Sequence, residues 1–545
     1  MLELLTAEEM KALDAWTIQE VGVPGPVLME TAGRGVVRAL LDRFAAEAGR
    51  GPVVVVCGRG NNGGDGFVVA RCLKNYGLDA VAVLLGSRDR VGGDAAVHLG
   101  AFLGSGGCLV EVTEGCEAEA AARVRGAALV VDAVLGTGLR AEVQGLAARA
   151  IGWMNEAPAP VVSVDIPSGV DSDTGAVRGA AVRADLTVTF AWPKRGHFLF
   201  PGAGLRGELA VVDIGIPRSG VGRVGPEVAL IDPEDLAGLV CRPPDAHKGT
   251  LGHVWVVGGS RGKTGAPGLA AVGALRAGAG LATVASPGGL GIEARLPLEV
   301  MTHPVDEGPD WPAGAWETLA GEPADAWVVG PGLGTGENAG RLVGALLERA
   351  ESPCVVDADA LNLLAAAGTP RLGPDRVLTP HPGEAARLLG RSTAEVQADR
   401  VGAAKALVER TGAVVVLKGA GTLVAAPGER VWLVAAGNPG MATAGTGDVL
   451  AGVIGALLAR GLAPSDAARL GAWVHAAAGD AAAAAGVEGR MAGDLLARLP
   501  EAMARIGSAA APAPGRDRWF PPAGVPGVRR QKTEDRGQGG LTSVL

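Results

Sequence analysis

The sequence predicts an α/β protein with two doubly wound, three-layer domains at residues 1–217 and 225–506, and a tail at residues 507–545. The chain has 545 residues, more than the roughly 100–200 expected of one domain. Apolar residues make up 48% of it, enough for a sizeable core. Short β-branched runs alternate with helix-length stretches rich in Ala, Leu and Arg, as in parallel sheets buried on both faces.

The predicted strands fall into two groups. Residues 213–228 are rich in Gly, Pro and Arg, which predicts a linker between the groups. Beyond Gly507 the chain loses its apolar period, and we expect this tail to be mostly disordered. The first group is 52–58, 79–86, 128–136, 160–169 and 184–192, and the second is 253–260, 281–287, 326–332, 353–359, 376–380 and 413–419.

Composition disfavours several classes of protein. The 49 basic residues are outnumbered by 58 acidic ones, whereas nucleic-acid binders are usually basic. The apolar run at 449–459 is too short to span a bilayer. The six Cys form no CxxC pair, and the N-terminus is acidic and amphipathic, without the pattern of a secretory signal. We therefore expect a cytoplasmic protein that binds small molecules rather than nucleic acid or membranes, with a homo-oligomer possible.

A glycine turn follows the first predicted strand. Gly58, Gly60 and Gly63 match GxGxxG between a strand and a helix, where glycines allow close approach to a phosphate and the helix N-terminus attracts it. The usual acidic residue at the end of the next strand is missing. The match is therefore weak by itself, and a purely structural turn is the alternative.

Oxygen-bearing side chains mark the ends of three predicted strands. Asn61, Asn62 and Asp65 lie in the glycine turn, and Asp132 ends another strand. Strand C-termini of a doubly wound sheet meet at one edge, so these loops should converge on one crevice. Each acid alone could be a helix cap or turn residue. Together they indicate a site for an anionic nucleotide with a cation, completed by the loop that carries Asp165, Ser168 and Asp171.

A second glycine run lies near the end of the second domain. The sequence AGTGD leads into an apolar helix and places Gly445, Thr446 and Gly447 at its N-terminus. Backbone amides there can bind a phosphoryl group, and Asp448 in the first turn can act as a base. A structural glycine run is again the alternative.

The first half resembles the N-terminal epimerase module of the NAD(P)H-hydrate repair proteins, in the motifs GRGNNGGDG, DAVLGTGLR and DIPSGVDSDTG. The resemblance implies a Rossmann-like domain, with K+ bound by Asn62, Asp132 and Ser168. We expect Asp165 to be the catalytic acid or base, with its pKa raised by a partly dry crevice. Lys194 could assist it, and Thr31 stands where the family usually has Asn. Substrate contacts are implied for Asn61, Asn62, Gly63, Gly64, Asp65, Gly136, Thr137, Gly138, Leu139, Arg140, Ala141, Glu142 and Asp165.

In the second half, GTGD and its helix resemble the ribokinase-like kinases. The fuller set HKGxxGHVxVVGGS, GPGLG, VDADALN, TPHPGE and KGAGT resembles the dehydratase module of the same repair family. It implies that the hydrated dinucleotide contacts Ala266, Gly332, His381 and the catalytic Asp448. His381 could instead simply cap a turn. The resemblance places ADP at Lys418, Gly419, Ala420, Gly421, Thr422, Gly445, Thr446 and Gly447, and Mg2+ or phosphate groups near Asp357, Asp359 and Asn362.

These observations favour a bifunctional repair enzyme that epimerises the R and S forms of hydrated NAD(P)H and dehydrates the S form. We expect ADP as the phosphate donor because bacterial family members resemble ADP users and eukaryotic ones ATP users, and the two modules are fused here as in the bacterial proteins. One alternative is a ribokinase-like kinase for a small hydroxymethyl compound, with an N-terminal nucleotide-binding module. Another is a binding protein without turnover.

Overall fold

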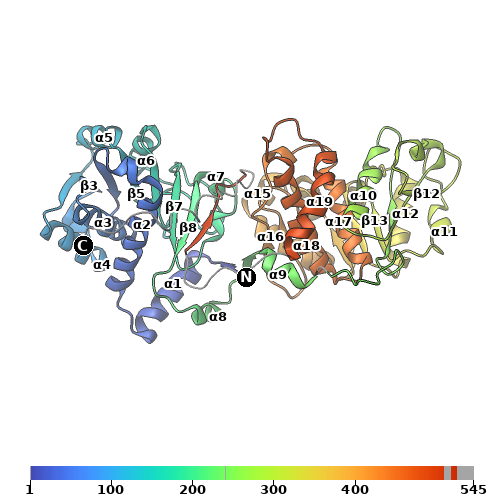
Figure 1. Cartoon of the computed structure of the whole chain (residues 1–545), viewed down its shortest axis with the longest axis horizontal. Helices are drawn as coiled ribbons and strands as arrows, with labels where there is room; N and C mark the ends of the chain where they lie inside the picture. The colour runs from blue at the N-terminus through green and yellow to red at the C-terminus, as the bar shows by residue number, and fades with distance from the viewer. Residues whose placement is uncertain (1, 240, 508–516, 525–545) are drawn as a thin grey trace.

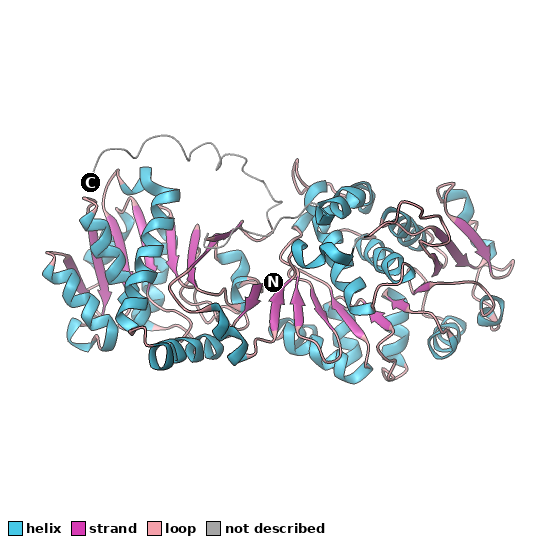
Figure 2. Ribbon diagram, turned by 60° about the horizontal axis from the view of Figure 1, so that its bottom comes forward, coloured by secondary structure: helices cyan, strands magenta, loops and turns pink. Residues whose placement is uncertain are grey.

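The computed structural model describes residues 2–239, 241–507 and 517–524. Two α/β bodies lie side by side along the long axis of the molecule (Figure 1), and each consists of a sheet with helices on both faces (Figure 2). The predicted fold class of two three-layer α/β domains, each built on a largely parallel sheet, is confirmed.

The first sheet has the strand order β19-β8-β7-β6-β5-β2-β3-β4. All neighbours pair in parallel except β19 with β8. From β2 the chain builds outward to β4 and then in the opposite direction from β5 to β8, so its switch point lies between β2 and β5. The strands are β2 (Val53–Cys57), β3 (Ala80–Leu85), β4 (Cys108–Val112), β5 (Leu129–Ala133), β6 (Val161–Val164), β7 (Leu186–Phe190), β8 (Glu208–Val212) and β19 (Arg518–Phe520).

Helices cover both faces of this sheet. One face packs on helices α2, α3 and α4, and the other on α5 and α6. The helices of this part are α1 (Ala7–Trp16), α2 (Gly25–Ala48), α3 (Asn61–Asn75), α4 (Gly93–Gly104), α5 (Ala118–Arg125), α6 (Gly145–Glu156), α7 (Gly202–Leu205) and α8 (Val221–Val224).

The second sheet has the order β1-β9-β18-β17-β16-β15-β14-β13-β10-β11-β12. Its strands are parallel from β16 to β12, and its switch point lies between β10 and β13. The strands are β1 (Leu2–Leu4), β9 (Val228–Leu230), β10 (His253–Val257), β11 (Leu281–Ser286), β12 (Met301–Pro304), β13 (Ala326–Val329), β14 (Cys354–Val356), β15 (Arg376–Leu378), β16 (Val414–Leu417), β17 (Leu423–Ala425) and β18 (Val431–Leu433).

Successive residues of a strand point to opposite faces, which divides the core of the second domain in two. On β10, Val254 and Val256 face α10, α17, α18 and α19, whereas Trp255 and Val257 face the side of α12, α13, α14 and α16. The helices are α9 (Pro233–Leu236), α10 (Gly265–Arg276), α11 (Ala315–Leu319), α12 (Glu337–Arg349), α13 (Ala358–Ala366), α14 (Pro382–Leu389), α15 (Thr393–Ala398), α16 (Arg400–Thr411), α17 (Thr446–Ala459), α18 (Pro464–Ala482) and α19 (Ala492–Gly507).

Two short strands cross between the halves. β1, at the start of the first half, pairs antiparallel with β9 in the second sheet. β19, from the tail, pairs antiparallel with β8 in the first sheet. The expectation of a mostly disordered tail therefore differs from the structure at residues 518–520, while residues 508–516 and 525–545 lie outside the described part of the chain. The boundaries at 217 and 225 stay a prediction.

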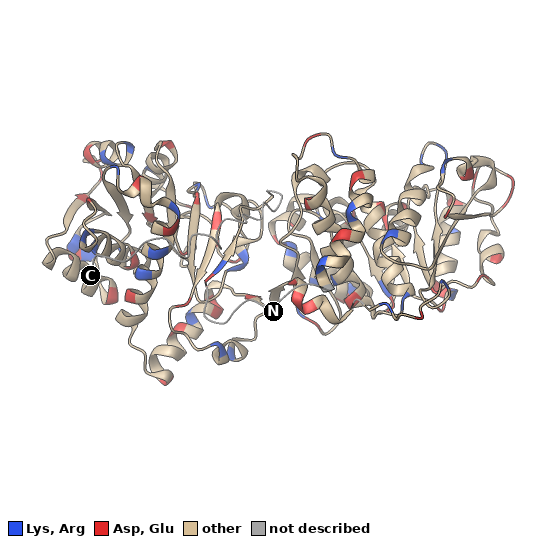
Figure 3. Cartoon of the chain, viewed as in Figure 1, with Lys and Arg blue, Asp and Glu red and all other residues tan. Residues whose placement is uncertain are grey.

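The surface carries both signs of charge. Lys and Arg are mixed with Asp and Glu over both domains (Figure 3), as expected from 49 basic and 58 acidic residues. Within the described ranges no helix is both long and apolar enough to cross a membrane.

Helices α10 and α17 pack so closely that even the Cβ atom of an added side chain would push them apart. A Cβ on Gly452 would lie 1.9 Å from the carbonyl oxygen of Ala270. We expect Gly452→Ala to lower the free energy of unfolding by about 1–3 kcal/mol, because overpacking outweighs the gain in helix propensity. The control is Gly344→Ala on the exposed side of α12, where no heavy atom lies within 4 Å; it should stabilise by up to about 1 kcal/mol. Urea unfolding of both variants tests this, and equal effects would contradict it.

Candidate active sites

The first candidate site lies at the switch point between β2 and β5, where α3 begins. The turn before α3 is compact enough to require glycine. A Cβ on Gly63 would lie 1.9 Å from the carbonyl oxygen of Gly58, and one on Gly58 would lie 2.1 Å from that of Val134. The backbone of the turn is thus held against the β5 loop, and α3 begins at the carboxyl edge of the sheet.

Asp132 is fully buried at the end of β5 and is surrounded by neutral donors. Ser168 donates to it twice, from its hydroxyl (2.5 Å) and from its backbone amide (2.8 Å), and the hydroxyl of Ser163 donates at 2.8 Å. Burial raises the pKa of Asp132, and these hydrogen bonds oppose the rise. Asn62 lies nearby across Gly136, and its buried Nδ2 has no hydrogen-bond partner within the described part of the chain. The structure therefore brings Asp132 and Ser168 into contact, with Asn62 on the same edge of the sheet.

Asp165 forms a buried ion pair with Lys194. The Lys194 Nζ donates to Asp165 Oδ1 at 2.6 Å, and the Thr189 hydroxyl donates to the same oxygen at 2.9 Å. Burial acts to raise the pKa of Asp165, but the Lys194 ammonium and these hydrogen bonds outweigh it and the pKa is lowered. The predicted rise in the pKa of Asp165 is therefore wrong. The sequence suggested that this carboxyl is partly buried, but it did not reveal that the Lys194 ammonium is buried beside it.

The backbone around Asp165 is strained and fixed. Asp165 has a φ of 64°, a left-handed conformation that costs a non-glycine residue energy and that clusters at functional sites. Its carbonyl oxygen accepts from His197 Nε2 at 2.9 Å, while His197 Nδ1 accepts from the Lys194 amide. Burial and the Lys194 charge lower the pKa of His197 to about 3, so its ring is neutral. The PKRGH segment thus holds the Asp165 loop in place.

Two further carboxyl groups face this ion pair. Burial, followed by the charges of Asp165 and Asp14, raises the pKa of Asp65 well above its usual value. Burial, against the Lys194 charge, raises the pKa of Asp14 to about 6. Asp14 lies on α1, far away in sequence, and no motif pointed to it. The site therefore combines one carboxyl whose pKa is lowered with two whose pKa values are raised, the arrangement in which acid and base roles can be divided.

The remaining predicted residues of this site make local contacts or lie at the surface. Gly136 packs on Asn62, and the loop after it, residues 137–142, runs along the surface. Thr31 donates its hydroxyl to the Val27 carbonyl within α2. Asp171 pairs with Arg178 and accepts from turn amides, so its carboxylate has a structural role.

The second candidate site lies at the N-terminus of α17. Gly445, with a φ of 93°, precedes the helix, and the amides of its first turn open into a cavity of about 390 Å³. This cavity is lined by residues 418–422, Thr446 and Gly447, which are positions where the resemblance places ADP; nucleotide binding there stays a prediction. The neutral ring of His475, whose pKa burial lowers to about 4, donates to the Thr446 carbonyl at 2.7 Å and fixes the turn.

Lys418 and three carboxyl groups surround the start of α17. The Lys418 Nζ donates to Asp357 Oδ1 at 2.7 Å and lies 3.9 Å from Glu384. A Cβ on Gly447 would lie 3.2 Å from the same nitrogen, so the ammonium stands over the helix N-terminus. Burial, followed by the charge of Asp357, raises the pKa of Asp448 to about 7 against the Lys418 charge. Burial likewise raises the pKa of Glu384, which sequence reasoning missed, to about 7.

The other predicted residues lie around this centre. A Cβ on Gly332 would lie 3.3 Å from that of Ala266, so these two positions adjoin. Asp359 accepts from Lys263 at 3.0 Å and Asn362 from Arg387 at 2.6 Å. His381 caps α14: its Nδ1 accepts from the Gly383 and Glu384 amides. The capping alternative is therefore correct for one ring nitrogen, and substrate contact through the half-exposed ring stays a prediction.

Each half therefore places a helix N-terminus, a glycine turn and a lysine–carboxylate pair at the switch point or carboxyl edge of its sheet. This arrangement defines a two-site α/β enzyme of the nucleotide-handling class.

Comparisons with known proteins agree with this class of enzyme. A family model described as NAD(P)H-hydrate dehydratase matches residues 254–501, and one described as YjeF-related protein N-terminus matches residues 25–196. The bifunctional NAD(P)H-hydrate repair enzyme of Moorella thermoacetica is 44% identical over 511 residues, 91% of this chain and 96% of that protein. The enzyme of that name from Escherichia coli is 41% identical over 453 residues, 82% and 84% of the two chains.

A solved ADP/ATP-dependent NAD(P)H-hydrate dehydratase from Bacillus subtilis, co-crystallised with ATP/Mg2+, is 30% identical and covers 51% of this chain and 99% of its own, with a TM-score of 0.46. The sequence relatives decide the family: the chain belongs to the bifunctional NAD(P)H-hydrate repair enzymes. The repair function predicted from the sequence is confirmed, and the small-molecule kinase alternative is not favoured.

Proposed function

We propose that the first domain epimerises the R and S forms of hydrated NAD(P)H and that the second dehydrates the S form with ADP. The observation that carries the second part is the cavity at the start of α17, where the Lys418 ammonium lies close to the helix N-terminus that carries Asp448. A phosphate donor is needed because hydroxide is a poor leaving group. The fused bacterial architecture supports ADP over ATP.

In the second site, Asp448 removes the proton of the 6-hydroxyl as that oxygen attacks the β-phosphorus of ADP. The new O–P bond replaces the bond to AMP, which leaves. The ring nitrogen lone pair then expels phosphate, and loss of a ring proton restores the dihydropyridine. Lys418 and the α17 amides hold the transferred phosphoryl group, whose charge they offset.

Mg2+ would suit this site through Asp357 and Asp359. Lys418 and Thr379 donate to Oδ1 of Asp357. Lys263 and the Gly334 amide donate to Oδ2 of Asp359, so among the described residues these bonds leave the second oxygen of each carboxylate for a cation. Mg2+ typically takes one or two carboxylates together with substrate phosphates, and it would neutralise phosphate charge there.

In the first site, we assign the base to Asp165, whose pKa the Lys194 ammonium lowers, and the acid to Asp65, whose pKa burial raises. The acid assists departure of the 6-hydroxyl or opening of the ring C–N bond, and re-formation on the other face gives the epimer. The buried carboxyl of Asp132 has no salt-bridge partner among the described residues. Its site therefore fits K+, held with the oxygens of Ser168 and Asn62, which would anchor the nucleotide-binding loops.

The pH dependence of dehydration follows from Asp448. Because its pKa is raised to about 7, the base is protonated in acid and ionised above neutrality. We expect kcat/KM for dehydration to fall about tenfold per pH unit below pH 7 and to level off above it. A rate profile measured between pH 5.5 and 8.5 at saturating ADP checks this; a flat profile would contradict the assignment.

Recovery of reduced-nicotinamide absorbance from hydrated NADPH tests the function. We expect recovery with ADP, little with ATP and none without a nucleotide. Accumulation of a phosphorylated product without recovery would support a kinase instead. A cytoplasmic location and a homo-oligomer stay predictions.

A further inference from the structure

The nucleotide cavity of the second domain is walled in part by other segments of the chain. Phe198, Phe200 and Arg206 of the first domain line it, together with Ala523 and Gly524 from the segment after β19. The carbonyl oxygen of Phe198 lies 3.0 Å from the position that a Cβ on Gly421 would take. The first domain therefore touches the loop at 418–422 directly.

This wall is firmly attached. The buried guanidinium of Arg206 donates to the carbonyl oxygens of His197 (2.7 Å), Gly207 (2.9 Å) and Pro521 (3.0 Å). The ring of Phe198 packs edge-on against Phe520 at 5.2 Å between centroids. One continuous surface is thus formed by the residues that flank Phe200 and the segment after β19. This surface fixes the position of Phe200.

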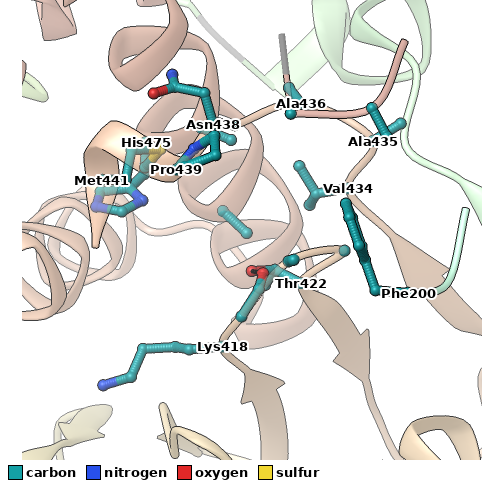
Figure 4. A pocket seen from close by; sticks show the side chains of 18 of the residues that line it. Phe200, Lys418, Thr422, Val434, Ala435, Ala436, Asn438, Pro439, Met441 and His475 are labelled. Atoms are coloured by element: carbon teal, nitrogen blue, oxygen red, sulfur yellow. Dashed lines mark hydrogen bonds between the residues drawn. The ribbon is translucent and has the colours of Figure 1, made fainter. Parts of the chain in front are cut away.

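The cavity has two chemically different ends. Lys418 and Gly447 mark a charged end at the helix N-terminus, where phosphate groups are stabilised. At the other end Phe200 lies beside Val434, and Thr422 lies between this pair and Lys418 (Figure 4). The ring of Phe200 is unusually exposed for its type, at 38% of the residue's surface. A nucleotide has the same polarity: an anionic chain at one end and a flat base at the other.

We propose that Phe200 packs against the adenine base of the nucleotide bound to the second domain, so that the first domain completes the nucleotide site. The inference rests on the proposed use of ADP in this cavity. An aromatic ring gives a base a stacking partner, and the bound base in turn covers an apolar ring that is otherwise exposed to water.

The test is titration calorimetry of ADP into the full chain and into Phe200→Ala. We expect binding to weaken about tenfold, within the range found when an aromatic partner of a base is removed. Phe200→Trp should restore affinity, and inorganic pyrophosphate, which has no base, should inhibit both proteins equally. The KM for ADP should rise in Phe200→Ala with little change in kcat. Tyr76→Ala is the matched control, because Tyr76 is an exposed aromatic (65%) at the end of α3 that lines none of the cavities described here.

The outcomes separate the two proposals. If the unmodified protein binds no ADP, the proposed function fails. If it binds ADP and Phe200→Ala binds equally well, the function stands and the inference is wrong. An equal loss for pyrophosphate would also overturn it, since the effect would then come from a disturbed cavity rather than a lost base contact.

Discussion

Asp448→Asn is expected to abolish nucleotide-dependent dehydration while epimerisation continues. The amide cannot accept the proton of the 6-hydroxyl, and a lost general base typically costs about 10²–10⁴-fold in rate. The fold should survive, because a carboxyl with a pKa of about 7 is already about half protonated at neutral pH and Asn has nearly the same shape. Removing one negative charge beside Lys418 should leave ADP binding intact or strengthen it.

The measurement is kcat/KM for dehydration of the S hydrate, with ADP affinity measured in parallel. Asp375→Asn serves as the control, because Asp375 is exposed just before β15, at the opposite edge of the sheet from α17. Residual dehydration above about a tenth of the original rate would remove Asp448 from the role of base.

Asp165→Asn is expected to impair epimerisation while dehydration continues, and also to destabilise the protein. Epimerisation should fall by at least about 10²-fold, because the base and its orientation are lost together. The ammonium of Lys194, which is 1% exposed, would stay buried without its counter-charge. Breaking a buried pair in this way typically costs about 3–5 kcal/mol.

Asp65→Asn keeps this prediction testable if Asp165→Asn folds poorly. Because burial raises the pKa of Asp65 well above its usual value, the neutral amide should replace this carboxyl at a smaller electrostatic cost than at an ordinary aspartate. This variant should retain its unfolding midpoint and dehydration rate but lose epimerisation about 10²-fold or more. Unchanged epimerisation would contradict the assignment of Asp65 as the acid.

Most of the buried parallel strands could be predicted from the sequence, and the remaining strands could not. All eleven predicted runs contain a strand, because buried parallel strands read as continuous β-branched segments. The edge strands β4 and β12 were missed because their side chains are largely exposed and their patterns are weak. The five-residue β8 was also missed, as were β1, β9, β17, β18 and β19, which have three residues each. Their pairing depends on distant segments, which a local pattern does not report.

The positions of the glycine turns and of Asp132, Asp165 and Asp448 were also predictable, since motif spacing fixes their place at the sheet edge. Protonation states were not. The Asp165 pKa depends on Lys194, which is 29 residues away in sequence, and Asp14 reaches the same site from α1. The same limit applies to Phe200, which lines a cavity in the other domain.

The central claim is that two separate sites on one chain act in succession on a damaged dinucleotide. Its most direct test is the extent of repair of an equilibrium mixture of R and S hydrates with ADP. The unmodified enzyme should return all of the mixture to NADPH, Asp165→Asn should return the S fraction rapidly and then slow to the uncatalysed rate, and Asp448→Asn should return none. Complete, rapid repair by Asp165→Asn, or loss of both activities in either folded variant, would contradict the two-site account.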